Sequence, residues 1–137
     1  MGVWQEPKTN WSGASDEFFN VQPDYQRIKG NIEYLYELSL KLFPTYTIYE
    51  LENVTYKSIP YVDFFNNIVY NIDLIANNSV RPLGYQTMRT YSENMSIWSY
   101  KDLNIIENNI KVLKDELQKR YDMLNQLPVM LGIREEF

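Results

Sequence analysis

The residue types that carry most enzyme chemistry are missing from this sequence. It contains no Cys and no His, which argues against thiolate nucleophiles, zinc–thiolate sites and imidazole-based catalysis. An acid–base mechanism would need two carboxylates facing each other. The candidate carboxylates are Glu33, Glu37, Asp63 and Asp73. Each is explained instead by a place on a helix surface or by the favourable interaction of an acid with the first turn of a helix. We therefore expect no enzymatic activity.

Metal and cofactor sites are equally unsupported by the sequence. The acidic and amide residues around positions 104 to 109 lack the spacing of a calcium loop and fall within an expected helix. None of the five glycines forms the G-x-G arrangement that cradles phosphate groups. We therefore expect no metal, no nucleotide and no other cofactor.

Composition predicts one folded domain that avoids nucleic acid and membranes. The 137 residues are 45% apolar and include 12 Tyr, 6 Phe and 3 Trp, which is too aromatic for a disordered chain. The net charge of −5 disfavours binding to phosphate backbones. No stretch approaches the roughly 18 apolar residues of a membrane span, and the first residues do not resemble a signal peptide.

An internal repeat organises the chain. A pattern of apolar, Asn or Gln, any, Ile, any two, Asn, Ile, any two, Leu or Ile occurs three times, with starts 40 and 38 residues apart at Tyr25, Phe65 and Leu103. Its apolar positions fall at i, i+3, i+7 and i+10, which places them on one stripe of a helix. Each copy therefore predicts an amphipathic helix.

The predicted fold class is all-α, a three-helix bundle built from three similar amphipathic helices. We expect helices near residues 22–43, 60–77 and 100–127, ended by Pro44, by the turn at Pro82 and by Pro128. The domain organisation is an extended aromatic N-terminal arm (1–21), the bundle (22–127) and a C-terminal tail (128–137). The two connections are long for a bundle, and their aromatic and β-branched residues predict extended segments that wrap it.

Three acid-first i,i+4 pairs occur along the third helix: Glu107–Lys111, Asp115–Lys119 and Glu116–Arg120. Such pairs stabilise exposed helix surfaces when the acid comes first. The sequence therefore predicts that this face of the helix is solvated.

Asn recurs at one position of all three copies, at Asn31, Asn71 and Asn109. Because Asn is a mediocre helix former, its recurrence indicates a structural role. We expect these side chains to hydrogen-bond to incoming loop backbone, or across helices, at the bundle boundary. The repeated isoleucines beside them, Ile28, Ile68 and Ile106, are assigned to the core.

Two apolar segments outside the helices are candidates for partner binding. The N-terminal arm carries Trp4, Trp11, Phe18 and Phe19, and the tail carries Met130, Leu131 and Ile133. The aromatic rings of the arm either cover the chain's own bundle or anchor it in a neighbouring subunit. For the tail, packing on its own chain and docking to a partner both remain open.

Two stretches of the sequence resemble a known family. The first combines residues 7–11, 16–20 and 24–35 (PKTNW, DEFFN and DYQRIKGNIEYL), and the second covers residues 97–110 (IWSYKDLNIIENNI). They resemble a helical module of tail, baseplate and other minor structural proteins of phages and prophages of Gram-positive bacteria. The resemblance runs from about Pro7 to Leu117. It departs at Ile105, where the family typically has Arg.

The resemblance implies a non-enzymatic structural role in the virion. A chain of this length would be a small adaptor or decoration subunit of the tail, baseplate or neck, made in the host cytoplasm. Its partners would be other phage structural proteins in a symmetric assembly or homo-oligomer, while a cell-wall glycan is a further candidate that no motif supports. The alternative is a free phage-encoded binding module that inhibits a host protein.

Overall fold

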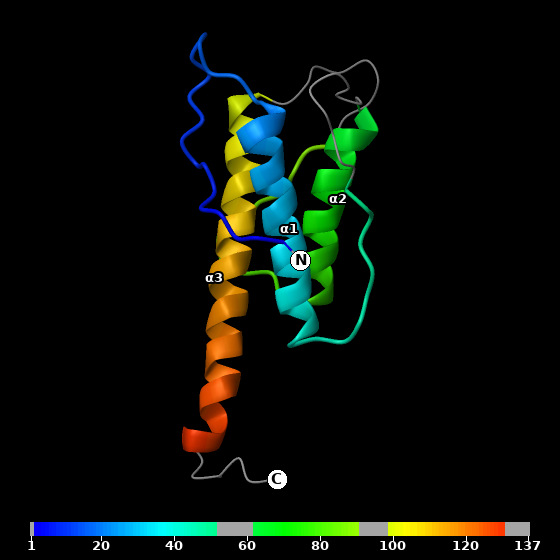
Figure 1. Cartoon of the computed structure of the whole chain (residues 1–137), viewed down its shortest axis with the longest axis vertical. Helices are drawn as coiled ribbons and strands as arrows, with labels where there is room; N and C mark the ends of the chain where they lie inside the picture. The colour runs from blue at the N-terminus through cyan, green and yellow to red at the C-terminus, as the bar shows by residue number, and fades with distance from the viewer. Residues whose placement is uncertain (1, 52–61, 91–98, 131–137) are drawn as a thin grey trace.

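The chain folds into three helices, as the computed structural model shows (Figure 1). The structure describes residues 2–51, 62–90 and 99–130, with only the backbone for 62–64 and 128–130. Helix α1 spans Gln26–Leu40 and follows a π-helical turn, η1, at Val21–Tyr25; α2 spans Val62–Asn78 and α3 spans Tyr100–Met130. The described residues contain no strand. The predicted all-α, three-helix fold is therefore confirmed.

Two predicted helix ends are wrong. The first helix stops at Leu40 rather than at 43, because the last turn tightens: the N–H groups of Lys41 and Leu42 donate to carbonyls three residues back, at 3.2 and 3.1 Å. The third helix does not end at Pro128 but runs to Met130. A proline removes one i→i−4 hydrogen bond, and in the final turn of a long helix that single loss does not end the helix.

All three helices run in the same direction. The contacts between α1 and α3 advance together along both helices, in the order Arg27–Glu107, Tyr34–Gln118 and Lys41–Tyr121. Figure 1 shows the same for α2, because the chain climbs from the lower end of α1 before α2 descends beside it. The bundle is therefore parallel.

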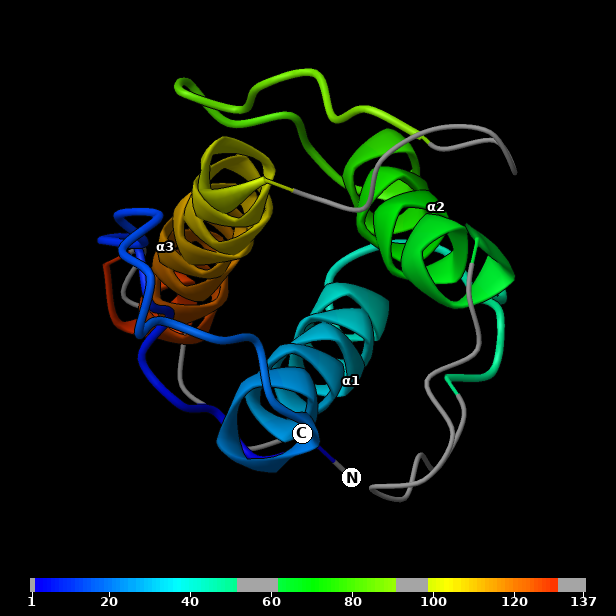
Figure 2. The same ribbon diagram turned by 90° about the horizontal axis from the view of Figure 1, so that it is seen from above.

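Three extended segments fill the grooves between the helices, and we call them straps. Strap 1 (residues 2–11) lies over α1 and α3, strap 2 (44–51) over α1 and α2, and strap 3 (81–90) over α2 and α3 (Figure 2). Strap 1 meets α3 at Trp4–Lys114, Lys8–Glu107 and Trp11–Asn104, and strap 3 meets α2 at Arg81–Asn77 and Tyr85–Asp73. Their residue numbers rise as the helix numbers fall, so these straps run antiparallel to the helices.

The parallel arrangement explains the long connections. Helix α2 has 17 residues and is therefore about 26 Å long. After each helix the chain must travel back over that distance before the next parallel helix begins, and an extended strand of about eight residues covers it. The connections are thus return crossings that pack against the helices they join.

The core lies along the bundle axis, where each helix contributes one apolar stripe. Ile28 and Ile68 are fully buried and Ile106 is 1% exposed, as their repeated positions predict. Around them lie further fully buried side chains from all three helices: Ile32, Leu35, Ile72, Ile75, Ile110, Leu113 and Leu117. Burying each such side chain contributes about 1.5–3 kcal/mol, so the stripes account for the association of the helices.

Candidate functional site: the strap clamps, the buried ion pair and the end of α3

Each repeated asparagine holds one strap by its backbone. In α1, the Oδ1 of Asn31 accepts from the N–H of Gln5 at 2.8 Å, and its Nδ2 donates to the Gln5 carbonyl at 2.8 Å. Asn71 in α2 holds Tyr49 in the same way, with both distances 2.8 Å. Asn109 in α3 holds Gln86, again at 2.8 Å for both. We call each such pair of hydrogen bonds a clamp.

Asn suits this task because its amide carries one acceptor and two donors on one short side chain. An extended residue has a backbone N–H and C=O that need hydrogen-bond partners. The backbone of a neighbouring helix cannot supply them, because the helix's own N–H and C=O groups are already bonded to each other. All three clamp asparagines are fully buried, whereas the strap residues that they hold are exposed, so the hydrogen bonds between them are partly buried. A clamp bonds only to backbone atoms, which explains why the clamped residues can differ in side chain: Gln5, Tyr49 and Gln86.

A fourth clamp was missed by the sequence analysis. The Oδ1 of Asn104 accepts from the N–H of Trp11, and its Nδ2 donates to the Trp11 carbonyl, both at 2.8 Å. Strap 1 is therefore clamped by Asn31 from α1 and by Asn104 from α3. The signal was present, because the repeat has an amide side chain at this position in every copy: Gln26, Asn66 and Asn104.

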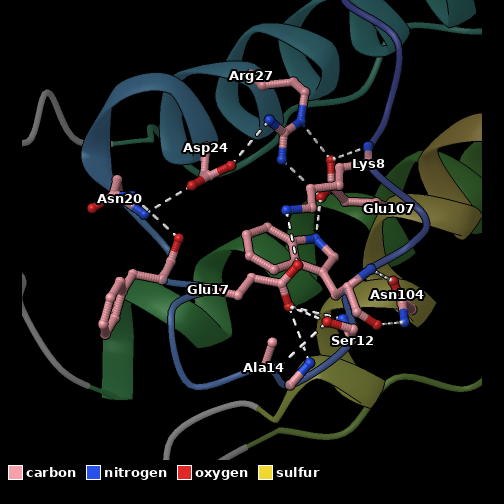
Figure 3. A network of polar contacts seen from close by, with 12 residues as sticks. Lys8, Ser12, Ala14, Glu17, Asn20, Asp24, Arg27, Asn104 and Glu107 are labelled. Carbon is pink, nitrogen blue, oxygen red and sulfur yellow. Dashed lines mark hydrogen bonds and ion pairs between the residues drawn. The ribbon is translucent and has the colours of Figure 1, made fainter.

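A buried ion pair joins α1 to α3 beneath strap 1. The guanidinium of Arg27 donates from Nε to Glu107 Oε1 at 2.7 Å and from Nη2 to Oε2 at 2.8 Å. Its Nη1 lies 3.1 Å from Asp24. Figure 3 shows Arg27 between the two carboxylates. This bidentate geometry is a strong form of Arg–carboxylate contact.

Strap 1 completes the hydrogen bonding of Glu107. The N–H of Lys8 donates to Oε1 at 3.0 Å, and the indole Nε1 of Trp11 donates to Oε2 at 2.7 Å. With the two bonds from Arg27, each oxygen of the carboxylate accepts twice (Figure 3). A buried charge is tolerated only when it is paired in this way. Docking of the strap and packing of the two helices therefore depend on the same residue.

The prediction of a solvated face at Glu107 is wrong, since this side chain is 0% exposed. The i,i+4 spacing to Lys111 was misleading. Glu107 also lies four residues after Leu103 and three before Ile110, and this spacing places it on the apolar stripe. The pair Glu116–Arg120 is present as predicted, at 3.1 Å and partly exposed.

Electrostatics keep the guanidinium of this cluster charged. Burial by itself would lower the pKa of Arg27, but its hydrogen bonds to Glu107 and the charges of Glu107 and Asp24 outweigh that effect and raise the pKa. Beyond strap 1, Glu17 accepts from the backbone N–H groups of Ser12 and Gly13 at 2.8 and 3.0 Å. The bond from Ser12 is the main cause of the lowered pKa of Glu17.

The aromatic residues of the N-terminal arm lie mostly on the chain's own bundle. Trp11 is buried, and Trp4 and Phe19 are partly buried against the core. Phe18 is 67% exposed and remains accessible to a partner. Of the apolar residues assigned to the tail, Met130 forms the last residue of α3, while Leu131 and Ile133 lie outside the described residues.

Exposed apolar side chains gather at the C-terminal end of α3. Met123, Leu124 and Leu127 are 55%, 49% and 44% exposed. Together with Arg120 and with Leu42 and Phe43, which follow α1, they line a hollow of about 420 Å³. In Figure 1 this end of α3 reaches well beyond α1 and α2. It is an apolar surface of the kind that binds other proteins.

The described residues place the candidate carboxylates on α1 and α2. They contain no group of three or more acidic side chains arranged to hold a metal ion. Of the candidate carboxylates, Asp73 accepts a hydrogen bond from the hydroxyl of Tyr85, Glu33 and Glu37 are half-buried on α1, and the side chain of Asp63 is outside the described part. Within that part, no helix is long and apolar enough to cross a bilayer.

Comparison with known proteins finds no match to a protein-family model, to a curated protein or to a solved structure. What the chain does must therefore be argued from its own residues and geometry.

Breaking a clamp should destabilise the protein. We expect Asn109→Ala to cost about 1–3 kcal/mol, because the N–H and C=O of Gln86 lose their partner. The isosteric Asn109→Asp should also destabilise, since it removes the donor. The adjacent Asn108→Ala is the matched control: it removes only an exposed 3.4 Å hydrogen bond to the Gly84 carbonyl and should change stability by less than about 0.5 kcal/mol. Urea unfolding measures all three, and equal costs for Asn108→Ala and Asn109→Ala would contradict the clamp.

The buried ion pair can be compared with an exposed one on the same helix. Glu107→Gln leaves Arg27 buried without its main counter-charge and should cost about 3–5 kcal/mol. Glu116→Gln removes a carboxylate from the exposed pair with Arg120 and should cost less than about 1 kcal/mol. Thermal or chemical unfolding distinguishes the two variants. A cost below about 1 kcal/mol for Glu107→Gln would show that the pair contributes little.

Alkaline pH should loosen strap 3. Burial first, then the hydrogen bond to Asp73 and its charge, raise the pKa of Tyr85 above its ordinary value of 10.0. The neutral phenol is thus favoured in the folded state, so its stabilisation is complete below about pH 10 and is lost as the pH rises further. Unfolding free energies between about pH 8 and 11 should fall less steeply for Tyr85→Phe than for the wild type.

Proposed function

We propose that this chain is a non-enzymatic structural subunit of a phage or prophage-derived particle. It acts in the tail, baseplate or neck by binding neighbouring virion proteins. The resemblance carried by residues 7–35 and 97–110 supports this class of protein, and the apolar end of α3 is the observation that supports a binding role.

Three similar units, each a strap followed by a helix, account for the architecture of the subunit. In every unit the clamp asparagine lies 22 to 26 residues after the residue that it holds. A helix of one unit and the strap that precedes it are thus joined within the unit, while the groove that receives the strap is completed by a neighbouring helix. This repetition suits a rigid spacer, because the clamps fix all three straps to the helices.

The proposed binding surface is separate from the parts that maintain the fold. Arg27, Glu107 and the three repeated clamp asparagines are buried, and they form their hydrogen bonds within the chain. Leu124, Leu127 and Phe18 are exposed instead. Residues for folding and residues for assembly therefore occupy different places in the molecule.

Mass spectrometry of purified particles from the source phage or prophage tests the proposal. We expect the protein in particles at a fixed ratio to a tail component of known symmetry, because a structural subunit follows the symmetry of its assembly. A major capsid protein from the same sample controls for yield. Abundance in the infected cytosol together with absence from particles would contradict the proposal and favour an inhibitor of a host protein.

A further inference from the structure

We propose that two copies of this chain pair through the C-terminal ends of α3, side by side and antiparallel about a two-fold axis. The inference deepens the proposed assembly function by naming one partner, a second copy of the chain. The surface involved is the α3 extension (residues 118–130), the part of α3 that follows its last buried core residue, Leu117.

The apolar stripe of α3 continues past the bundle. The buried residues of α3 alternate in steps of three and four, at Leu103, Ile106, Ile110, Leu113 and Leu117. The same steps lead through Arg120 to Leu124 and Leu127, which are about half exposed. A 3-4 spacing is the seam along which helices pack on other helices. In the α3 extension the seam therefore continues without α1 or α2 to cover it.

Each copy carries both halves of a self-complementary contact. Leu124 and Leu127 form a ridge, and beside it Leu42 and Phe43 form the far wall of the hollow. A two-fold rotation places the ridge of one copy in the hollow of the other, and the reverse contact follows by symmetry. A closed pair of this kind buries both apolar surfaces at once.

Charge favours the antiparallel orientation. The base of the extension carries basic residues at Lys41, Lys119 and Arg120, whereas the last turn of α3 contains no basic residue. The C-terminal end of a helix has a partial negative charge that cations stabilise. In the antiparallel pair, the end of each α3 lies near the base of the other. Of these cations, Arg120 is paired with Glu116, which leaves Lys41 and Lys119 for this contact. Of the other nearby acids, Asp122 accepts from Gln118, and Asp115 is exposed four residues before Lys119.

The size of the surface predicts a weak dimer. Five large apolar side chains line the hollow of each copy. A standard stable interface uses about 20–30 residues and roughly 800 Å² of surface from each partner. The isolated protein should therefore pair only at high concentration. Within a symmetric particle, the local concentration of neighbouring copies strengthens the same contact.

Sedimentation equilibrium over a range of concentrations tests the pairing. The average mass of the wild type should rise from 16.4 kDa toward twice that value. Leu124→Glu and Leu127→Glu should each weaken the dimer at least about tenfold. Val3→Glu is the matched control, because Val3 is a 70% exposed apolar residue of strap 1 and lies outside the extension, and it should leave the dimer intact. Circular dichroism confirms that the variants fold.

A charge reversal tests the orientation of the pair. Because it changes surface lysines, the result does not depend on whether the leucine variants fold. Lys119→Glu should weaken the dimer several-fold, while Lys101→Glu, at an exposed lysine near the start of α3, should not. The proposal is overturned if the wild type stays at 16.4 kDa throughout, if it forms trimers, or if Leu124→Glu and Val3→Glu behave alike. Particle composition is measured separately, so failure of the dimer leaves the assembly function standing.

Discussion

An extended segment packed against helices must find partners for its backbone, and this requirement shapes the molecule. The N–H and C=O groups of a helix interior are already used by the helix itself. Strap backbone that faces a groove can then be paired only by side chains. Asn31, Asn71, Asn109 and Asn104 each supply a donor and an acceptor at 2.8 Å. Without these amides, the partly buried N–H and C=O groups of the straps would lose their partners, at a cost of about 1–3 kcal/mol for each clamp.

The parallel direction of the helices and the straps explain each other. Parallel helices require return crossings, and each crossing covers a groove that would otherwise expose core side chains. Trp11 shows how closely the two are coupled, because its backbone is held by Asn104 while its indole donates to Glu107, the partner of Arg27. Strap, clamp and ion pair thus form one connected polar network around strap 1 (Figure 3).

The C-terminal end of α3 differs from the rest of the helix in how its apolar side chains are covered. Inside the bundle every apolar position of the seam is covered by α1, by α2 or by a strap. Beyond Leu117 the helix continues with Leu124 and Leu127 but without such cover. Leu124 and Leu127 are about half exposed within the chain, so they are available for contacts between molecules.

The sequence by itself determined the three helices, their core isoleucines and the recurring asparagines, because helical period and repetition are local patterns. It could not determine that the helices are parallel, nor which strap each asparagine holds, since these depend on contacts between residues more than 20 positions apart. The fate of Glu107 shows the difference most clearly. Local spacing pairs it with Lys111 at the surface, whereas tertiary packing buries it against Arg27, 80 residues away in the chain, because only there is its charge matched by four donors.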